Sequence, residues 1–408
     1  MCAPMTNAVQ AHHGDSDDQM ASLQGERVGR VRRPLPGGRG VRLTAVGVAT
    51  ALAVAGGVVA CGRVNLKQQA DDAAASLASA KVVSFTLHLD DPKNSLASAS
   101  RSADDAKTLA MLRDSAISVT VDPAGDTSFG TAMKPSTSAA QDPAAPLKHS
   151  GAIDVTYTHA GKSVVALRMD GGVLYLHVDP AQIQAITGQP LPLDQLTGPD
   201  MPPGLAPVAE GLKSGKWLSL DLSSLYERIV KLGGSSGFGG LGGTQALGGN
   251  LGEIRSKILA AVSANTTTTS SAGPDGAVLI AVKVNARAAV QGVLDALAGL
   301  PGPAAGALAS ARAQLAQVPD GTLDGTVTIK DGHYTRVAVD LHSLAVLSKD
   351  ADAMKGTVGT ELVVDVNDRA APITAPTSDQ VVQLDTLADA MVGPLLQMGP
   401  SGLAALAH

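Results

Sequence analysis

Several short stretches of the chain alternate strictly between hydrophobic and polar residues. Between residues 82 and 90 the hydrophobic positions include Val83, Phe85, Leu87 and Leu89, and a polar residue follows each of them. A period of two predicts a β-strand with one buried face and one wet face. The same alternation predicts further strands, whose hydrophobic positions are Ile153, Val155 and Tyr157, then Val165, Leu167 and Met169, and finally Leu362, Val364 and Val366.

Turns containing glycine join some of these strands into hairpins. Asp170-Gly171-Gly172 leads into a strand at 173–178, and a second hairpin over 325–341 turns at Asp331-Gly332. Such turns are typical of antiparallel pairs. Stretches rich in Ala and Leu predict helices at 70–80, 96–114, 222–232, 254–264 and 287–317, the last broken at Pro301 and Pro303. The predicted fold class is α+β, with a curved antiparallel sheet that has one side in solvent.

Residues 233–252 form an insert rich in Gly and Ser, which predicts a loop. The insert divides the chain into halves that each offer a helix, strands and a hairpin. We expect one domain over residues 81–395 that contains this insert. Two domains split at the insert are the alternative.

The N-terminal region has the pattern of an export signal. Six arginines lie between residues 27 and 42, and residues 43–60 are uncharged and dominated by Leu, Val, Ala and Gly. This run ends Val58-Val59-Ala60-Cys61, which is typical of a bacterial lipobox. We therefore expect cleavage between Ala60 and Cys61 and attachment of lipid to the Cys61 thiol.

This pattern predicts a signal peptide at 1–60, a lipidated tether with a first helix at 61–80, and a protein held by its lipid at the outer face of the cell membrane. A retained membrane-spanning helix is the alternative, because the apolar run is near the short end of the ~17–25 residues that span a bilayer. Both place the rest of the chain outside the cytoplasm. The start codon (Met1, Met5 or Met20) stays open, and Arg32-Arg33 leaves twin-arginine export as an alternative to the favoured general secretory route.

Composition and charge exclude some partners. Only 2% of the residues are aromatic, too few for the stacking platforms that bind single-stranded nucleic acid. The formal net charge of −6, which becomes more negative once the basic residues of 1–60 are removed, repels phosphate backbones. The two cysteines are Cys2 and Cys61, so the mature chain has no disulfide. We expect no nucleic-acid partner and no cofactor.

Catalytic and metal-binding patterns are weak. The insert matches G-x-G-x-x-G at 237–242 and G-x-S-x-G at 233–237, but both motifs need a strand before them and a helix after them. The histidines lack the spacing of zinc ligands, and His88 is expected to be a solvated surface residue. We expect no catalytic residues, no metal site and no enzymatic activity.

Four segments carry a resemblance to a known family. They are 81–86 (KVVSFT), 169–175 (MDGGVLY), 215–222 (GKWLSLDL) and 332–334 (GHY). Their order resembles actinobacterial lipoproteins of the LppX/LprG type, part of the wider set of LolA/LolB-like half-barrel lipid carriers. The resemblance spans about residues 68–370, and the insert and the helical segment at 287–317 depart from it.

The resemblance implies a half-barrel sheet whose concave side is covered by helices and encloses an apolar cavity for acyl chains. The residues expected to line it, taken from the hydrophobic phase of the strands, are Val83, Phe85, Leu87, Leu89, Val155, Tyr157, Leu167 and Leu362. The expected function is binding or carrying lipid or glycolipid, with an envelope protein as a further candidate partner. The alternative is a non-catalytic envelope scaffold in which the same residues form a packed core.

Overall fold

The computed structural model describes residues 64–100, 102–132, 151–198, 205–229, 251–298, 305–315, 320–348 and 356–384. All of them belong to one compact unit of the chain, Ala45–His408. The lipobox with Cys61, residues 233–250 of the insert, and the stretch 385–395 of the expected domain lie outside the described residues.

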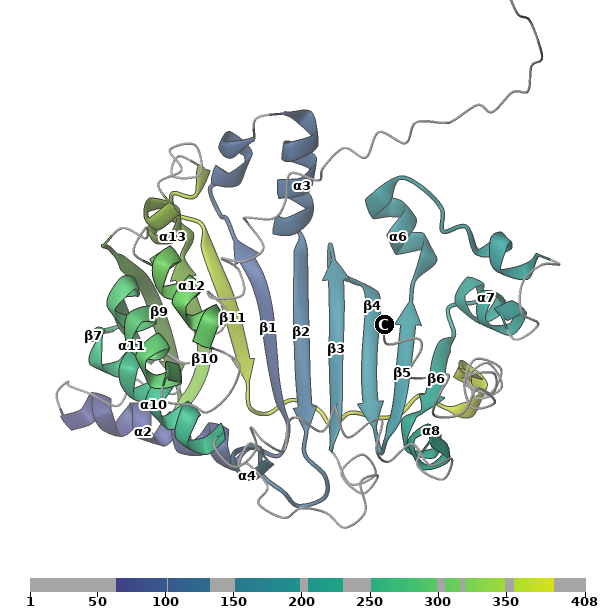
Figure 1. The fold of residues 1–408 in the computed structure, drawn as a ribbon, viewed down its shortest axis with the longest axis horizontal. Coiled ribbons are helices and arrows are strands. Elements are labelled where there is room, and N and C mark those ends of the chain that lie inside the picture. The colour runs from purple at the N-terminus through teal and green to yellow at the C-terminus, as the bar shows by residue number, and fades with distance from the viewer. Residues whose placement is uncertain are drawn as a thin grey trace, which may run out of the picture. The chain divides into compact units, whose positions relative to one another are not determined.

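The described strands form one sheet of 12 strands (Figure 1). Its order is β12-β6-β5-β4-β3-β2-β1-β11-β10-β9-β8-β7, and every neighbouring pair is antiparallel except β12 and β6. The prediction of an α+β fold built on an antiparallel sheet is confirmed. The strands are β1 Val83–Asp90, β2 Ser115–Asp122, β3 Ala152–His159, β4 Lys162–Asp170, β5 Val173–Val178, β6 Trp217–Asp221, β7 Thr266–Ala272, β8 Val278–Asn285, β9 Thr322–Lys330, β10 His333–Asp340, β11 Glu361–Asn367 and β12 Val381–Gln383.

Helices lie between the strands, as the sequence predicts, although α4, α6, α7 and α13, whose bounds are given below, were not predicted. Two of the predicted segments also differ from the observed helices. Helix α2 begins at Val64, inside the segment expected to be a tether. The single helix expected at 96–114 is a 3-10 helix, Ser95–Ala99, followed by α3, because Ser102 is extended and caps α3 by accepting from the Asp105 amide. The α-helices are α2 Val64–Ser79, α3 Ala103–Arg113, α4 Phe129–Ala132, α6 Pro180–Thr187, α7 Leu205–Lys213, α8 Leu222–Ile229, α10 Leu251–Ala264, α11 Ala286–Ala298, α12 Ala305–Leu315 and α13 Leu341–Ser348.

The strand register places the hydrophobic phases of all these strands on one side of the sheet, called here the apolar face. Phe85 of β1 lies opposite Val119 of β2, Val119 opposite Val155 of β3, and Val155 opposite Leu167 of β4. Since residues paired directly across a ladder point to the same side, the eight residues predicted to line a cavity share the apolar face. The intervening polar residues share the opposite side, called here the polar face.

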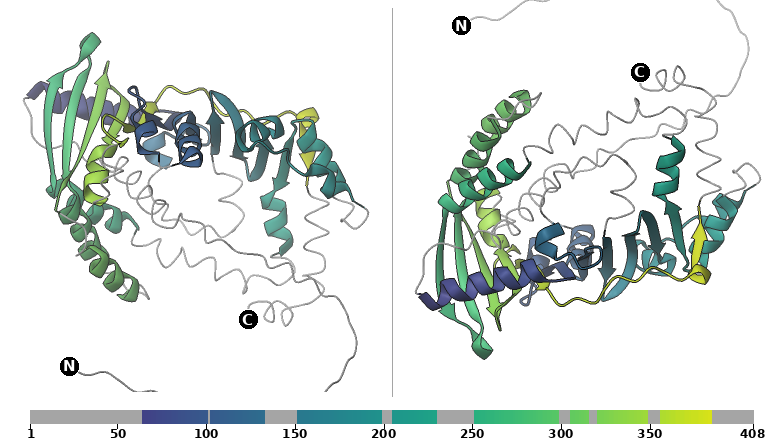
Figure 2. Two further views of the ribbon diagram at one scale, coloured as in Figure 1. Left: turned by 90° about the horizontal axis from the view of Figure 1, so that it is seen from above. Right: turned by 90° about the horizontal axis from the view of Figure 1, so that it is seen from below.

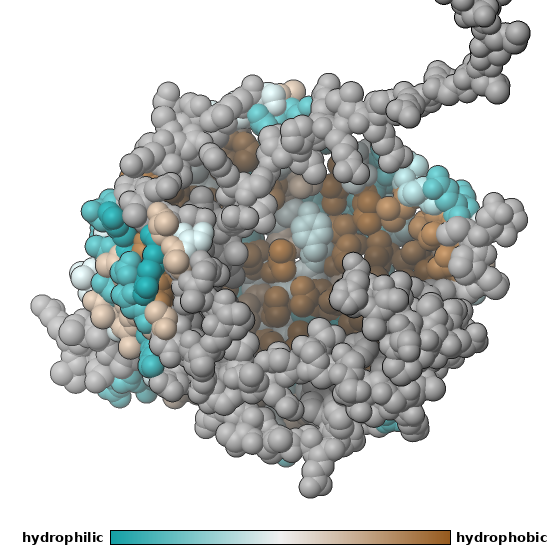
Figure 3. Space-filling model, viewed as in Figure 1, coloured by the Kyte–Doolittle hydropathy of each residue, from teal (hydrophilic) through white to brown (hydrophobic). Residues whose placement is uncertain are grey.

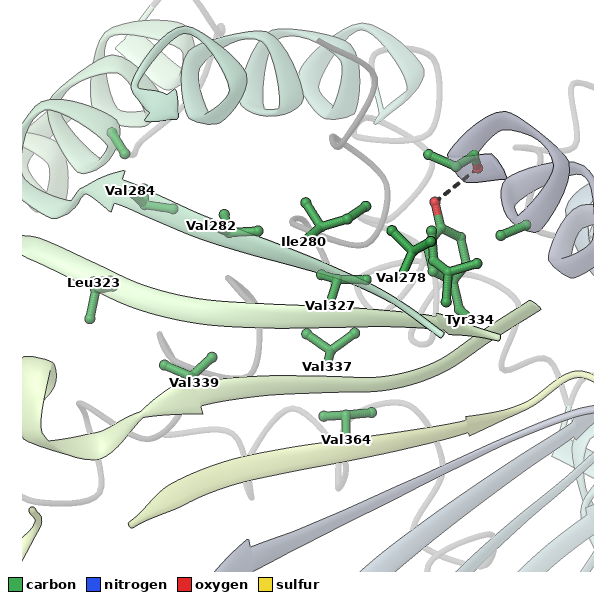
Figure 4. Packing of buried hydrophobic residues seen from close by; sticks show 14 of the residues in the cluster. Val278, Ile280, Val282, Val284, Leu323, Val327, Tyr334, Val337, Val339 and Val364 are labelled. Carbon is green, nitrogen blue, oxygen red and sulfur yellow. Dashed lines mark hydrogen bonds between the residues drawn. The ribbon is translucent and has the colours of Figure 1, made fainter. Parts of the chain in front are cut away.

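Helices cover the apolar face where it is formed by β8 to β11. Val278, Ile280 and Val282 point from β8 toward helices (Figure 4), and Ala70 and Ala73 of α2 join the same buried cluster. Figure 2 shows α10, α11 and α12 gathered beside β7–β9, and α11 contacts both other helices. This half of the sheet therefore has a conventional packed core, whose strand residues are Val278, Ile280, Val282, Val284, Leu323, Val327, Ile329, Tyr334, Val337, Val339 and Val364.

Candidate functional site

The apolar face changes character over β2, β3 and β4. Large hydrophobic side chains are exposed here: 42% of Ile117, 37% of Ile153 and 41% of Leu167. In the space-filling view, hydrophobic side chains form the floor of a hollow over the middle strands (Figure 3). We call this surface the apolar strip, and its residues are Ile117, Val119, Val121, Ile153, Val155, Tyr157, Val165, Leu167 and Met169.

Packed regions border the apolar strip on both sides. Toward β1, the ring of Phe85 meets that of Phe129 from α4, with centroids 5.9 Å apart. Toward the other edge, α7 lies so close to the sheet that a Cβ on Gly211 would be 2.7 Å from Val382 Cγ2 and 3.5 Å from Leu218 Cδ2. The strip is thus a less covered stretch of a face that is otherwise closed by helices.

The structure divides the eight residues predicted to line a cavity into two groups. Val83 and Leu362 are buried, and Phe85 and Leu87 pack against the core cluster. Leu89 is half-buried and lies opposite Leu362. The remaining three, Val155, Tyr157 and Leu167, belong to the apolar strip. That any of the eight faces a ligand stays a prediction.

A polar cluster closes the apolar strip at the end nearest α3. Ser115 and His159 are register partners, and on the apolar face they are the next pair after Ile117 and Tyr157. Ser115 Oγ lies 2.9 Å from Tyr157 Oη and 3.3 Å from His159 Nδ1, and it donates to the Met111 carbonyl at 2.6 Å. Sequence reasoning found Tyr157 by its phase but missed Ser115 and His159, because β2 was not expected to be a strand.

Two charged residues adjoin this cluster. Arg113 donates from Nε to Asp114 Oδ1 at 2.9 Å, and this hydrogen bond lowers the pKa of the Asp114 carboxyl. The Arg113 guanidinium also reaches Asn94 Oδ1 at 2.6 Å. The pair therefore brings little net charge to this end of the strip.

The polar face is held together by ion pairs and ring contacts. Arg168 donates to Asp154 Oδ2 at 2.7 Å, and its guanidinium carbon lies 4.9 Å from the centre of the Trp217 ring. The tryptophan of the GKW segment thus stacks on an arginine on the polar face. Arg168 also donates to the Thr374 carbonyl, and the Ile373 amide donates to Asp122 Oδ2 at 2.9 Å, so the segment that leads to β12 is fixed to this face.

His88, which was expected to be a surface residue on the polar face, contacts a carboxylate there. Its Nε2 lies 2.9 Å from Asp365 Oδ2 on the neighbouring strand β11. The two residues are close because His88 lies opposite Val363, and Asp365, two residues along β11 from Val363, is the diagonal neighbour of His88 on the polar face.

A serine, a histidine and an aspartate meet where α2 crosses the end of β10. Ser76 Oγ lies 2.8 Å from His333 Nδ1 and donates to Asp368 Oδ2 at 2.9 Å, while His333 Nδ1 lies 2.7 Å from the same carboxylate oxygen. In a hydrolase triad the serine and the aspartate occupy different ring nitrogens of the histidine. Here both share Nδ1 and Arg369 contacts Nε2, so the arrangement fastens α2 to the sheet and lacks the geometry of a proton relay.

Two kinds of feature are absent from the described residues. No group of three or more His, Cys, Asp or Glu side chains within them is arranged to hold a metal ion. None of the helices in the described ranges is both long and apolar enough to cross a membrane.

Comparisons with known proteins give distant structural similarity and no sequence match. No protein-family model matches the chain, and no curated protein sequence matches it. The crystal structure of the Mycobacterium tuberculosis lipoprotein LppX matches with 11% identity and a TM-score of 0.27, over 77% of this chain and 100% of that chain. A match with that TM-score does not support a conclusion about the fold. The fold stated above rests on the strand pairing of this chain.

Proposed function

We propose that the protein is a lipoprotein, anchored through Cys61 at the outer face of the cell membrane, that binds or carries lipid or glycolipid on the apolar strip. One observation carries the proposal: Ile117, Ile153 and Leu167 are 37–42% exposed on three adjacent strands of the apolar face. Contiguous exposed hydrophobic surface is typical of interaction and ligand-binding sites.

Covering each of these side chains with a ligand contributes a small favourable free energy of binding. These contributions add up over the strip. Burying the exposed part of one such side chain contributes about 1 kcal/mol. Acyl chains suit this surface because they need aliphatic contact and no stacking partner, and the strip is mainly aliphatic. No catalytic step is proposed, since binding and release of an apolar ligand need no chemical transformation.

The proposal is tested by asking whether lipid binding depends on the strip. The full chain with Cys61→Ala, which carries no lipid anchor, is purified from its native host and analysed by native mass spectrometry and lipid extraction. We expect a bound lipid. Leu167→Lys should lower the bound fraction at least tenfold, because an ammonium group is costly to cover with acyl chains.

Val358→Lys serves as the matched control, since Val358 is 51% exposed but lies outside the strip. It should leave lipid binding unchanged. Protein that is free of lipid, together with no effect of Leu167→Lys on uptake of added lipid, would overturn the proposal. It would leave the alternative of an envelope scaffold that binds another protein.

A further inference from the structure

The polar cluster at the α3 end of the apolar strip has a hydrogen-bonding pattern that follows from counting protons. Ser115 Oγ has a single proton, and it donates this proton to the Met111 carbonyl at 2.6 Å. The oxygen can therefore only accept from its two other neighbours. Tyr157 Oη must donate to it at 2.9 Å, and His159 must carry its proton on Nδ1 and donate at 3.3 Å.

This assignment fixes what the cluster offers to a ligand. The Tyr157 proton is used, so the phenol oxygen presents only lone pairs. In the neutral imidazole with a proton on Nδ1, Nε2 is likewise an acceptor, and the structure gives it no partner among the described residues. The cluster therefore presents two acceptors and calls for a ligand that donates hydrogen bonds.

The position of the cluster gives this ligand an orientation. Four residue pairs of β2 and β3 share the apolar face, from Ser115 and His159 at the polar end to Val121 and Ile153 at the other end. At about 3.3 Å per residue, these pairs span roughly 20 Å, which suits a long acyl chain. Near the polar end, Arg113 and Asp114 pair with each other, and Lys162 is the register partner of His159.

We infer that Tyr157 and His159 form a headgroup subsite for an amphiphile with an uncharged, hydroxyl-bearing headgroup, whose acyl chain lies along the apolar strip toward Ile153. This inference rests on the proposed function and adds to it the class of headgroup and the direction of binding. A phosphate headgroup would meet acceptors where it needs donors.

The experiment compares ligands of equal chain length that differ in the headgroup. The full chain with Cys61→Ala is delipidated and titrated by calorimetry with 1-monolauroylglycerol, which has two hydroxyls, with methyl laurate, which has none, and with dodecyl phosphate. We expect monolauroylglycerol to bind at least tenfold more tightly than either other ligand. Tyr157→Phe and His159→Ala should each reduce the preference for monolauroylglycerol over methyl laurate to threefold or less.

Tyr175→Phe is the matched control, because Tyr175 is a half-buried tyrosine whose register partner is Arg168 on the polar face. It should leave the preference intact. An unchanged preference in both subsite variants, or stronger binding of dodecyl phosphate than of monolauroylglycerol, overturns the inference and leaves the proposed function standing. Failure of the unsubstituted Cys61→Ala chain to bind any of the three ligands overturns both.

Discussion

Tyr334 links α2 to the sheet inside the packed core. It is 4% exposed, and its hydroxyl donates to the Ala70 carbonyl at 3.2 Å. Burial raises the pKa of the Tyr334 phenol, because the phenolate would lose its hydration in the core. The neutral phenol is therefore part of the folded state.

Replacing Tyr334 by Phe should lower the free energy of unfolding by about 1 kcal/mol at neutral pH, the net contribution of a typical hydrogen bond. The folded-state pKa lies above the unfolded one, so this contribution of the phenol is complete below about pH 10 and is lost as the pH rises through the folded-state value. Urea unfolding of both proteins between pH 8 and pH 11 measures it. The wild type should lose more stability with rising pH than Tyr334→Phe, and parallel pH profiles would contradict the assignment.

Much of the sequence-based prediction rests on the alternation of hydrophobic and polar residues. This alternation identifies strands and their faces, but it does not show how deeply each residue is buried. The period of two identified β1 and placed Val83 to Leu89 in one phase, which the register confirms. The phase alone does not distinguish Val83, which is fully buried, from Leu167, which is 41% exposed. That difference depends on which helix covers which strand, and helix placement is a tertiary property.

At the scale of elements, the prediction failed where local signals were weak or competed. The residues Ile117, Val119 and Val121 of β2 alternate, but the segment directly follows a helical pattern, and no strand was predicted for it. Strand β7 is mostly Thr and Ser, and pairs with β8 without a hydrophobic phase of its own. Strand β12 has three residues, and its pairing with β6 depends on a segment fixed far away along the chain by Arg168 and Asp122.

The edge formed by α7, β6 and β12 gives a prediction at this scale. A methyl group at Gly211 would lie 2.7 Å from Val382 Cγ2, closer than carbon atoms can approach. Gly211→Ala should therefore lower the free energy of unfolding by about 1–3 kcal/mol through overpacking, despite the better helix propensity of Ala.

Val382→Ala removes the methyl group that Gly211→Ala would meet, so the two substitutions form a double-mutant cycle. We expect the double variant to be more stable than the sum of the single effects, by at least about 0.5 kcal/mol. Chemical denaturation of the four proteins measures this coupling. Strict additivity would show that α7 moves away from β12 without cost.

For the whole molecule, the anchor is the first prediction to test. Cys61 lies outside the described residues, and α2 begins three positions after it. Cys61→Ala should shift the protein from the membrane fraction to the soluble fraction and remove the acyl mass from the mature chain. Fractionation and intact mass spectrometry measure both. Unchanged membrane partition would favour the retained helix.

The second prediction for the whole molecule concerns its domains. Strand β1 pairs with β11 from Ser84 to Asp90, and β6 pairs with β12, so both ladders join parts of the chain on opposite sides of the insert. Limited proteolysis within 233–252 should therefore leave two fragments that stay associated in size-exclusion chromatography and unfold together. Fragments that separate and refold alone would establish two domains.

The position of β1 also sets an order of events in folding. It lies inside the sheet between β2 and β11, and its contact from His88 to Asp365 joins residues 277 positions apart. Contacts this distant in sequence form slowly, because a long loop must close before they contribute. A chain that crosses a membrane from its N-terminus would carry β1 across long before β11 arrives. For such a chain, the sheet could be completed only after β11 had crossed.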